Sequence, residues 1–247
     1  LQVAGTASLI GAGASSLAGA EKAPAAAPFR GKIYKSVKYG GRVNLKRLQS
    51  LKDLGFDGVE GSAPGMDVEG LRKACAELDM PMHGVVYNKH WKMRLSSPDP
   101  KVREIGRKGL EDAIRESHAV GGSSVLLVPG AVKGKGETHD HVWNRSITEI
   151  RKVLPLASKL GIRVLIETVW NGFCYKPEQF RDYLDAIDSP WVGAYYDIGN
   201  YPESLDAYLR VAQLRPKLSD TYYNIALTYN RMEQSLQADL YYNRYQD

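Results

Sequence analysis

From about residue 32 onward, short apolar segments alternate with longer amphipathic segments. The short segments are rich in β-branched residues and flanked by Gly or Pro, which is typical of buried strands. The longer segments have apolar residues at helical spacing. We predict strands at 32–37, 58–60, 82–86, 124–128, 163–166 and 191–196. We predict helices between them at 44–54, 67–79, 101–119, 144–160 and 177–187.

This alternation indicates an α/β fold, because parallel strands need a crossover connection that is usually a helix. A closed (β/α) barrel of the TIM type and an open doubly wound sheet both fit the pattern. The segment YGGRVNL after the first strand lacks the glycine fingerprint of dinucleotide-binding sheets. Its absence disfavours the open Rossmann-type sheet.

The sequence changes character after residue 200, since all 24 glycines lie at or before Gly199. Helical spacing over 203–215 and 219–245 predicts an all-α tail, 201–247, whose large and small residues let antiparallel helices interlock. This tail resembles the tetratricopeptide repeat (TPR), although Tyr245 stands where that family usually has a small residue. The resemblance implies a surface for binding another protein.

The first twenty residues carry no charge and consist mainly of Ala, Gly, Ser and Leu. They end in Ala18-Gly19-Ala20, a small-x-small pattern that suits signal peptidase. The segment 1–20 resembles the later part of a bacterial twin-arginine (Tat) export signal, which predicts an exported, periplasmic protein. A transmembrane helix is disfavoured because the apolar run is short and glycine-rich. Residues 21–31 have the composition of a linker.

The composition is that of a globular protein, with 43% hydrophobic and 25% charged residues. The net charge is +5, but the Lys and Arg residues are scattered and form no basic stripe for nucleic acid. Cys75 and Cys174 are too few for a disulfide framework and are predicted to be packing residues.

Catalytic residues of (β/α) barrels lie at the carboxyl ends of the strands. The polar residues assigned to predicted strand ends are Glu60, His83, Glu167 and Asp197. Glu167 follows the apolar run 164–166, where an unpaired charge is costly, so it is either a metal ligand or half of an ion pair. Asp197 is either a metal ligand or a cap or turn residue. Oxygen ligands with histidine suit Mn²⁺, Mg²⁺ or Co²⁺ better than a thiolate metal.

The other candidates are assigned to substrate binding. For Glu60 the alternative interpretation is a simple Glu-Gly turn. For His83 it is a core histidine whose hydrogen bonds are satisfied within the protein. Aromatic rings beside polar groups suit a sugar, and the competing interpretation is a surface loop with a buried Trp. Such pairs are His90 with Trp91, and Trp170 with Asn171.

Two tempting motifs are discounted. Residues 133–138, KGKGET, lack the spacing of a P-loop and are predicted to be a flexible loop. Residues 139–141, HDH, are predicted to lie before a helix as a cap with solvent-facing histidines.

Residues 32–200 resemble the xylose isomerase-like TIM barrel family of sugar isomerases and epimerases. The resemblance rests on LKDLGFDGVEG, SSVLLVPGAV, ASKLGIRVLIETVWN and SPWVGAYYDIGN. It implies carbohydrate metabolism and one divalent metal held by Glu, Asp, His and Glu from strands five to eight. The two glutamates would move the proton on the carbon next to a carbonyl. Glu167 and Asp197 match the first two ligands, and Asn200 stands where some members bind substrate with His.

No strand-like segment follows residue 200, so the sequence predicts an incomplete barrel of about six βα units. Our leading hypothesis is a metal-dependent sugar or sugar-phosphate isomerase or epimerase domain with catalytic Glu167 and impaired activity. The alternative is a non-catalytic scaffold with a protein-binding TPR-like tail. A nuclease of the same superfamily is disfavoured, because such enzymes need more metal-binding histidines and a basic groove.

Overall fold

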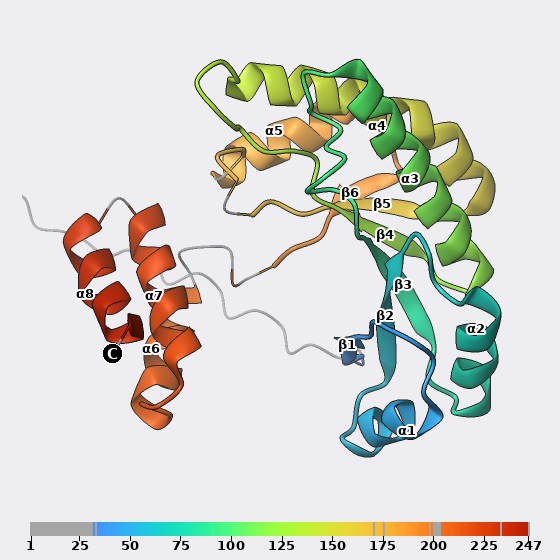
Figure 1. The fold of residues 1–247 in the computed structure, drawn as a ribbon, viewed down its shortest axis with the longest axis horizontal. Coiled ribbons are helices and arrows are strands. Elements are labelled where there is room, and N and C mark those ends of the chain that lie inside the picture. The colour runs from blue at the N-terminus through green and yellow to red at the C-terminus, as the bar shows by residue number, and fades with distance from the viewer. Residues whose placement is uncertain are drawn as a thin grey trace, which may run out of the picture. The chain divides into compact units, whose positions relative to one another are not determined.

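The fold is described from a computed structural model (Figure 1). It covers residues 32, 34–169, 171–174, 176–197, 199, 204–232 and 234–246. Residues 34–247 belong to one unit. The predicted export signal, 1–20, and linker, 21–31, lie outside the described residues, so both stay predictions. Trp170 and Asn200 lie outside them as well.

Six parallel strands form one sheet in the order of the sequence. A doubly wound sheet would reverse its strand order part-way, so this order is that of a TIM-type barrel. The α/β prediction is therefore confirmed. Within the described residues β1 and β6 are the edge strands. The strands are β1 (Ser36–Lys38), β2 (Gly58–Ala63), β3 (Met82–Tyr87), β4 (Ser124–Leu127), β5 (Arg163–Ile166) and β6 (Val192–Ala194).

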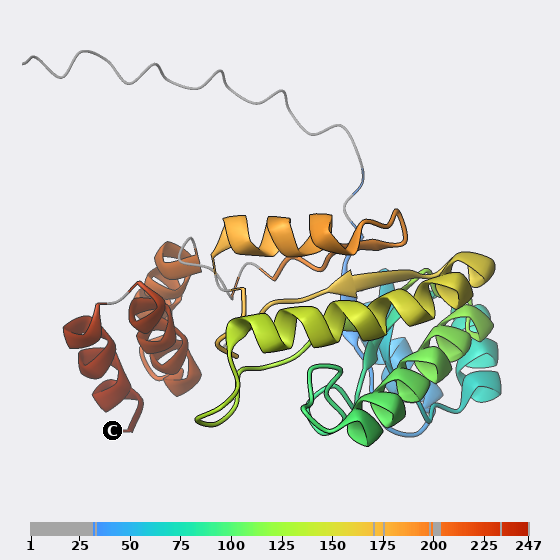
Figure 2. The ribbon, with the colours of Figure 1, turned by 90° about the horizontal axis from the view of Figure 1, so that it is seen from above.

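Five helices connect these strands and lie on the outer side of the curved sheet (Figures 1 and 2). Four of them have an N-cap residue whose side chain accepts a hydrogen bond from a backbone amide of the first turn. That amide has no acceptor within the helix, so the N-cap side chain satisfies it. Along the row, α3 packs against α4, and α4 against α5. The helices are α1 (Leu45–Asp53), α2 (Val68–Glu77), α3 (Pro100–Ala119), α4 (His139–Leu160) and α5 (Pro177–Ile187).

Alternate residues of each strand point to opposite faces of the sheet, which separates the core into two parts. On the helix side, Val85, Val125 and Val164 are fully buried in the large core. On the inner side, Val86 and Leu126 belong to a small apolar cluster that also includes Val128. Polar side chains that follow the inward-facing strand positions therefore lie next to this small apolar cluster.

The start of α4 confirms one part of a prediction and corrects another. Thr138 is the N-cap residue: its hydroxyl accepts from the His141 amide at 3.2 Å, and Nδ1 of the exposed His141 accepts from the Thr138 amide at 3.3 Å, so one histidine of the HDH motif takes part in the cap as predicted. His139 forms part of the first turn, and its ring centroid lies 4.8 Å from that of Phe173. The expectation of a solvent-facing histidine is therefore wrong for His139 alone, because its ring packs against Phe173 and Trp143 and is only partly exposed.

Both cysteines are buried and free, as expected of packing residues. Burial raises the pKa of the Cys174 thiol to about 12. Its sulfur lies 3.6 Å from Nε2 of His139. A thiol with such a pKa is protonated near neutral pH and is a poor nucleophile.

The predicted helical tail consists of α6 (Leu205–Leu214), α7 (Ser219–Arg231) and α8 (Ser235–Gln246). Helices α7 and α8 pack together, with Ile225 and Ala238 buried. The all-α tail is confirmed, whereas its assignment to the tetratricopeptide repeat stays a prediction.

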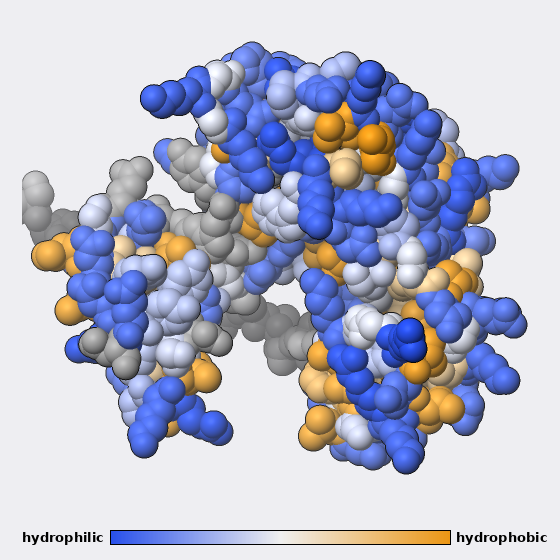
Figure 3. All heavy atoms as spheres, in the orientation of Figure 1, coloured by the Kyte–Doolittle hydropathy of each residue, from blue (hydrophilic) through white to orange (hydrophobic). Residues whose placement is uncertain are grey.

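The surface seen in Figure 3 is largely hydrophilic, and apolar atoms gather beside α1. The exposed side chain of Leu54, which follows that helix, is 74% accessible. Among the helices that the structure describes, none combines the length and apolar character needed to cross a bilayer.

Candidate functional site

A cavity of about 480 Å³ opens at the carboxyl ends of the strands, above the inner apolar cluster. Polar side chains reach it from the ends of β1, β5 and β6, from the loop after β3, and from within β2, since that strand continues to Ala63 and Glu60 does not end it as predicted. Its lining consists of Lys38, Glu60, Val86, His90, Trp91, Leu126, Val128, Glu167, Tyr195, Tyr196 and Asp197. The structure therefore brings together five of the predicted site residues.

Glu167 and Asp197 lie side by side in this cavity. Glu167 directly follows β5, and its amide still donates to the Leu127 carbonyl at 3.0 Å, so the strand geometry aims the side chain inward. Asp197 follows β6, where its Oδ1 accepts from the Gly199 amide at 2.8 Å. The two carboxyl groups share a hydrogen bond. Burial, and then the negative charge of Asp197, raise the pKa of Glu167 to about 7.

Glu60 enters from β2 and is 8% exposed. The Tyr195 hydroxyl donates to its Oε2 at 3.4 Å. Burial, reinforced by the Glu60 charge, raises the pKa of Tyr195. The phenol is therefore protonated at neutral pH, and because its one O–H is directed at Glu60, its oxygen is left as an acceptor at the cavity wall.

Lys38, the last residue of β1, supplies the one cationic side chain in the described lining. Its backbone is in register with Glu60. Its positive charge lowers the pKa of both Glu167 and His90, although burial and Asp197 outweigh it at Glu167. The ammonium group is therefore close enough to both side chains to influence them.

His90 and Trp91 come from the loop after β3, as predicted. The His90 ring is 8% exposed and stands edge-on to Trp91, with centroids 5.1 Å apart. Burial, then the charge of Lys38, lower the pKa of His90 to about 4. The ring is therefore neutral near pH 7. Because the Val128 amide donates to Nδ1 over 3.5 Å, we assign the proton to Nε2.

His83 does not join the site. It is the second residue of β3, and the strand continues to Tyr87, so His83 lies near the amino end of the strand with an exposed side chain. The assumption that it ends the strand is wrong. Its carbonyl accepts from the amide and the hydroxyl of Ser123, at 2.9 and 3.0 Å. His83 therefore contributes to strand pairing at the amino ends of the strands, away from the cavity.

Asn171 is buried beside the site without lining the cavity. Its Nδ2 donates to the Gly130 carbonyl at 2.6 Å, and its Oδ1 accepts from the Phe173 amide at 3.2 Å. It thus joins the loop after β4 to the loop after β5. Its neighbour Trp170 and the predicted contact Asn200 lie outside the described residues.

Sequence reasoning missed Lys38 and Tyr195. The first strand was predicted to end at residue 37, which left Lys38 just beyond it. Tyr195 was assigned to the interior of a strand that in fact ends at Ala194. The alternation of inward positions, counted back from Asp197, would have placed Tyr195 in the cavity.

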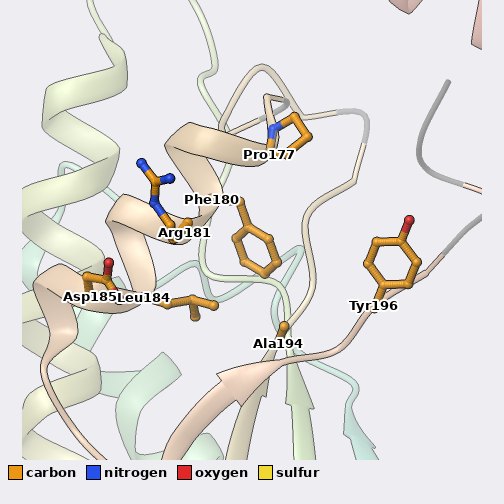
Figure 4. A pocket seen from close by; sticks show the side chains of 7 residues that line it. All are labelled: Pro177, Phe180, Arg181, Leu184, Asp185, Ala194 and Tyr196. Carbon is orange, nitrogen blue, oxygen red and sulfur yellow. The ribbon is translucent and has the colours of Figure 1, made fainter. Parts of the chain in front are cut away.

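A second cavity, of about 440 Å³, lies between α5 and β6 (Figure 4). Phe180 points into it, and Tyr196 faces it from the segment after β6, whereas Arg181 points away. Its lining holds a single carboxylate, Asp185, so of these two cavities only the first has a cluster of carboxylates.

The donor set for a metal is partial. Glu167 and Asp197 offer two adjacent hard-oxygen ligands of the kind that Mn²⁺ or Mg²⁺ accepts. Within the part of the chain that the structure describes, no three His, Cys, Asp or Glu side chains gather in a way that would hold a metal. The pair therefore fits two positions of a coordination sphere.

Residues 48–222 match the family model for the xylose isomerase-like TIM barrel, so the chain belongs to this family. The match extends past residue 200 and includes α6. The chain is 26% identical over 180 residues to an L-ribulose-5-phosphate 3-epimerase, UlaE, of Salmonella heidelberg (strain SL476). It is 25% identical to the UlaE epimerase of Escherichia coli O157:H7. Each alignment covers 68% of this chain and 63% of the relative.

Solved epimerase structures share the fold. A D-psicose 3-epimerase from Clostridium cellulolyticum H10, solved with D-tagatose, aligns with a TM-score of 0.58 and 13% identity. That alignment covers 78% of this chain and 70% of the epimerase. An L-ribulose 3-epimerase aligns with a TM-score of 0.57 and 17% identity, covering 86% of this chain and 97% of that chain.

Proposed function

We propose that the cavity acts on a sugar or sugar phosphate as an isomerase or epimerase site, with Glu167 moving the proton on the carbon next to a carbonyl. The observation that supports this most directly is the Glu167 carboxyl group itself. Because its pKa is about 7, the group can accept a proton and donate it again with similar ease near neutral pH. Family membership gives the chemical class, and the UlaE relatives suggest a ketopentose phosphate.

The neighbouring side chains suit this chemistry. When the carbon loses its proton, negative charge develops on the carbonyl oxygen, and the Lys38 ammonium stabilises it. Nε2–H of neutral His90 donates to a hydroxyl group. The Trp91 ring, 45% exposed, packs on the C–H face of the sugar.

Glu167 and Asp197 would hold a divalent ion, Mn²⁺, Mg²⁺ or Co²⁺, through their carboxylate oxygens. Such an ion, when bound, polarises the substrate oxygens. With two carboxylates as its protein ligands, we expect binding weaker than that of a complete four-ligand site.

Epimerisation needs proton donors on both faces of the carbon, and Glu167 provides one. We therefore propose that removal and return of the proton at one face is faster than full epimerisation. Among the residues that the structure describes we assign no second acid–base group to the other face, and the lack of such a group slows a reaction roughly 10²–10⁴-fold, so impaired turnover remains our proposal.

Solvent deuterium exchange tests this proposal, since it needs only the proton on one face. The purified chain is incubated in D₂O with Mn²⁺ and a ketopentose 5-phosphate, then with the unphosphorylated ketopentose, and the loss of the α-proton signal is followed by NMR. Exchange that Glu167→Gln abolishes, and that the exposed-site control Glu178→Gln keeps, supports the proposal. No exchange above the protein-free rate with either sugar contradicts it.

A second function concerns α7 and α8. Tyr223, Tyr242 and Tyr245 form a ring cluster with centroids 5.1–6.4 Å apart, and each is at least 37% exposed. Exposed aromatic rings are enriched at protein interfaces. We propose that this cluster binds another protein. Tyr242→Ser with Tyr245→Ser in the full chain is expected to abolish a specific complex while leaving deuterium exchange unchanged. Export to the periplasm likewise remains our proposal for residues 1–20.

A further inference from the structure

The loop between β4 and α4 forms a pocket of its own, of about 330 Å³. Residues 133–137 of the loop line it, together with Arg94 and Pro98 from the segment before α3 and Arg145 from α4. Four cationic side chains thus surround a single carboxylate, that of Glu137.

Glu137 is already neutralised by its neighbours. Its side chain is 6% exposed, and its Oε2 accepts from Arg94 at 3.0 Å and from the Lys133 amide at 2.8 Å. Its Oε1 accepts from Arg145 at 3.4 Å. Glu137 therefore holds the loop against the two arginines, and the pocket retains an excess of positive charge.

The remaining donors of the loop are unused. Lys133 and Lys135 are exposed, and neither ammonium group has a carboxylate partner among the described residues. Within that same part of the chain, the amides of Gly134, Lys135 and Gly136 donate to no protein acceptor. A Cβ at either glycine would meet nothing within 4 Å, so a ligand can approach this backbone.

The conformation of the loop also favours an anion. Gly134 has φ +78, and a left-handed residue of this kind is a component of the backbone turns that bind anions. Helix α4 begins directly after the loop, at His139, and its amino end adds partial positive charge.

We propose that this pocket binds a phosphate-type dianion through Lys133, Lys135 and the loop amides. A tetrahedral group with several charged oxygens matches two ammonium groups and consecutive amides better than a single carboxylate does. The main cavity cannot serve this purpose well, because Glu60, Glu167 and Asp197 repel an anion. The pocket stands on its own residues and does not depend on the proposed reaction.

Titration with inorganic phosphate, followed by NMR and calorimetry on the full chain, tests the pocket. Lys133→Ala with Lys135→Ala is expected to weaken phosphate binding about tenfold or more, because each substitution removes a charge-assisted hydrogen bond to the anion. The control is Lys73→Ala with Lys159→Ala, two exposed lysines on α2 and α4, which changes the net charge equally. Absence of saturable binding, or an equal loss in both double variants, overturns the proposal.

Two further arms identify the source of the phosphate group. If it belongs to a sugar substrate, a ketopentose 5-phosphate binds more tightly than inorganic phosphate, and the loop variant reduces its affinity to that of the unphosphorylated sugar. If it is a free anion, the sugar phosphate and inorganic phosphate bind equally well. Either outcome supports the pocket, and because both measure binding, they are independent of deuterium exchange.

Discussion

Glu167 and Asp197 share a hydrogen bond between carboxyl groups at the ends of adjacent strands β5 and β6. Two half-buried carboxylates this close repel each other when both are charged, which favours a proton on one of them. The raised pKa of Glu167, about 7, is the consequence.

The first prediction is that this pair binds Mn²⁺. We expect saturable binding by the full chain, measured by electron paramagnetic resonance of the free ion. Glu167→Gln with Asp197→Asn removes both oxygen ligands and should weaken binding about tenfold or more. The matched control is Glu178→Gln with Asp206→Asn, both exposed. Equal affinity of the two double variants would show that the ion binds elsewhere.

The second prediction concerns Lys38. Lys38→Met should slow deuterium exchange roughly 10²-fold, because the charge that stabilises the developing oxyanion is lost. Lys38→Arg keeps the charge and should restore part of the rate. Lys46→Met, on the exposed face of α1, is the control for lost net charge. A normal rate for Lys38→Met would remove this lysine from the proposed chemistry.

Elements with sharp boundaries could be predicted from the sequence. The ranges 163–166 and 177–187 agree with β5 and α5, because Gly161 ends α4 in the left-handed region and Pro177 starts the next helix. The edge strand β1 was predicted too early. The residues before it, 32–35, include one β-branched residue and one aromatic residue, which favour a strand. The described pairing with β2 begins at Ser36, and such tertiary pairing is not contained in the local pattern.

The site was predictable where a carboxylate follows a largely apolar run of the sequence, as Glu167 and Asp197 do. It was not predictable where the side-chain role depends on distant contacts. Asn171 follows the same strand as Glu167, yet it joins two loops through Gly130 and Phe173 rather than lining the cavity. Nothing local in the sequence distinguishes such a buried amide from a sugar-binding one.

The third prediction tests how the His90–Trp91 loop is supported. A Cβ at Gly106 of α3 would clash with the Met93 carbonyl oxygen, so Gly106→Ala forces the two backbone segments apart. We expect a loss of about 2 kcal/mol or more in the free energy of unfolding, measured with urea. Gly40→Ala is the control, because a Cβ there would meet nothing within 4 Å. Equal stability of the two variants would contradict the close approach of α3 to this loop.

The fourth prediction is a pH dependence of stability that originates at His90. Its pKa is about 4 in the folded chain and lies near the ordinary value of 6.5 when unfolded. Between these values the unfolded chain binds the proton and the folded chain does not. Stability from this residue is therefore complete above about pH 6.5 and is lost as the pH falls toward 4.

The expected change is about 2 kcal/mol between pH 7.5 and 4.5, since each pKa unit corresponds to roughly 1.4 kcal/mol. It is measured as the difference in unfolding free energy between the wild type and His90→Gln at each pH, which cancels the other titrating groups. The wild type should lose its advantage, or fall below the variant, at the lower pH. A His90 ring that titrates near 6.5 by NMR would contradict its burial, and with it the neutral Nε2–H donor assigned to the site.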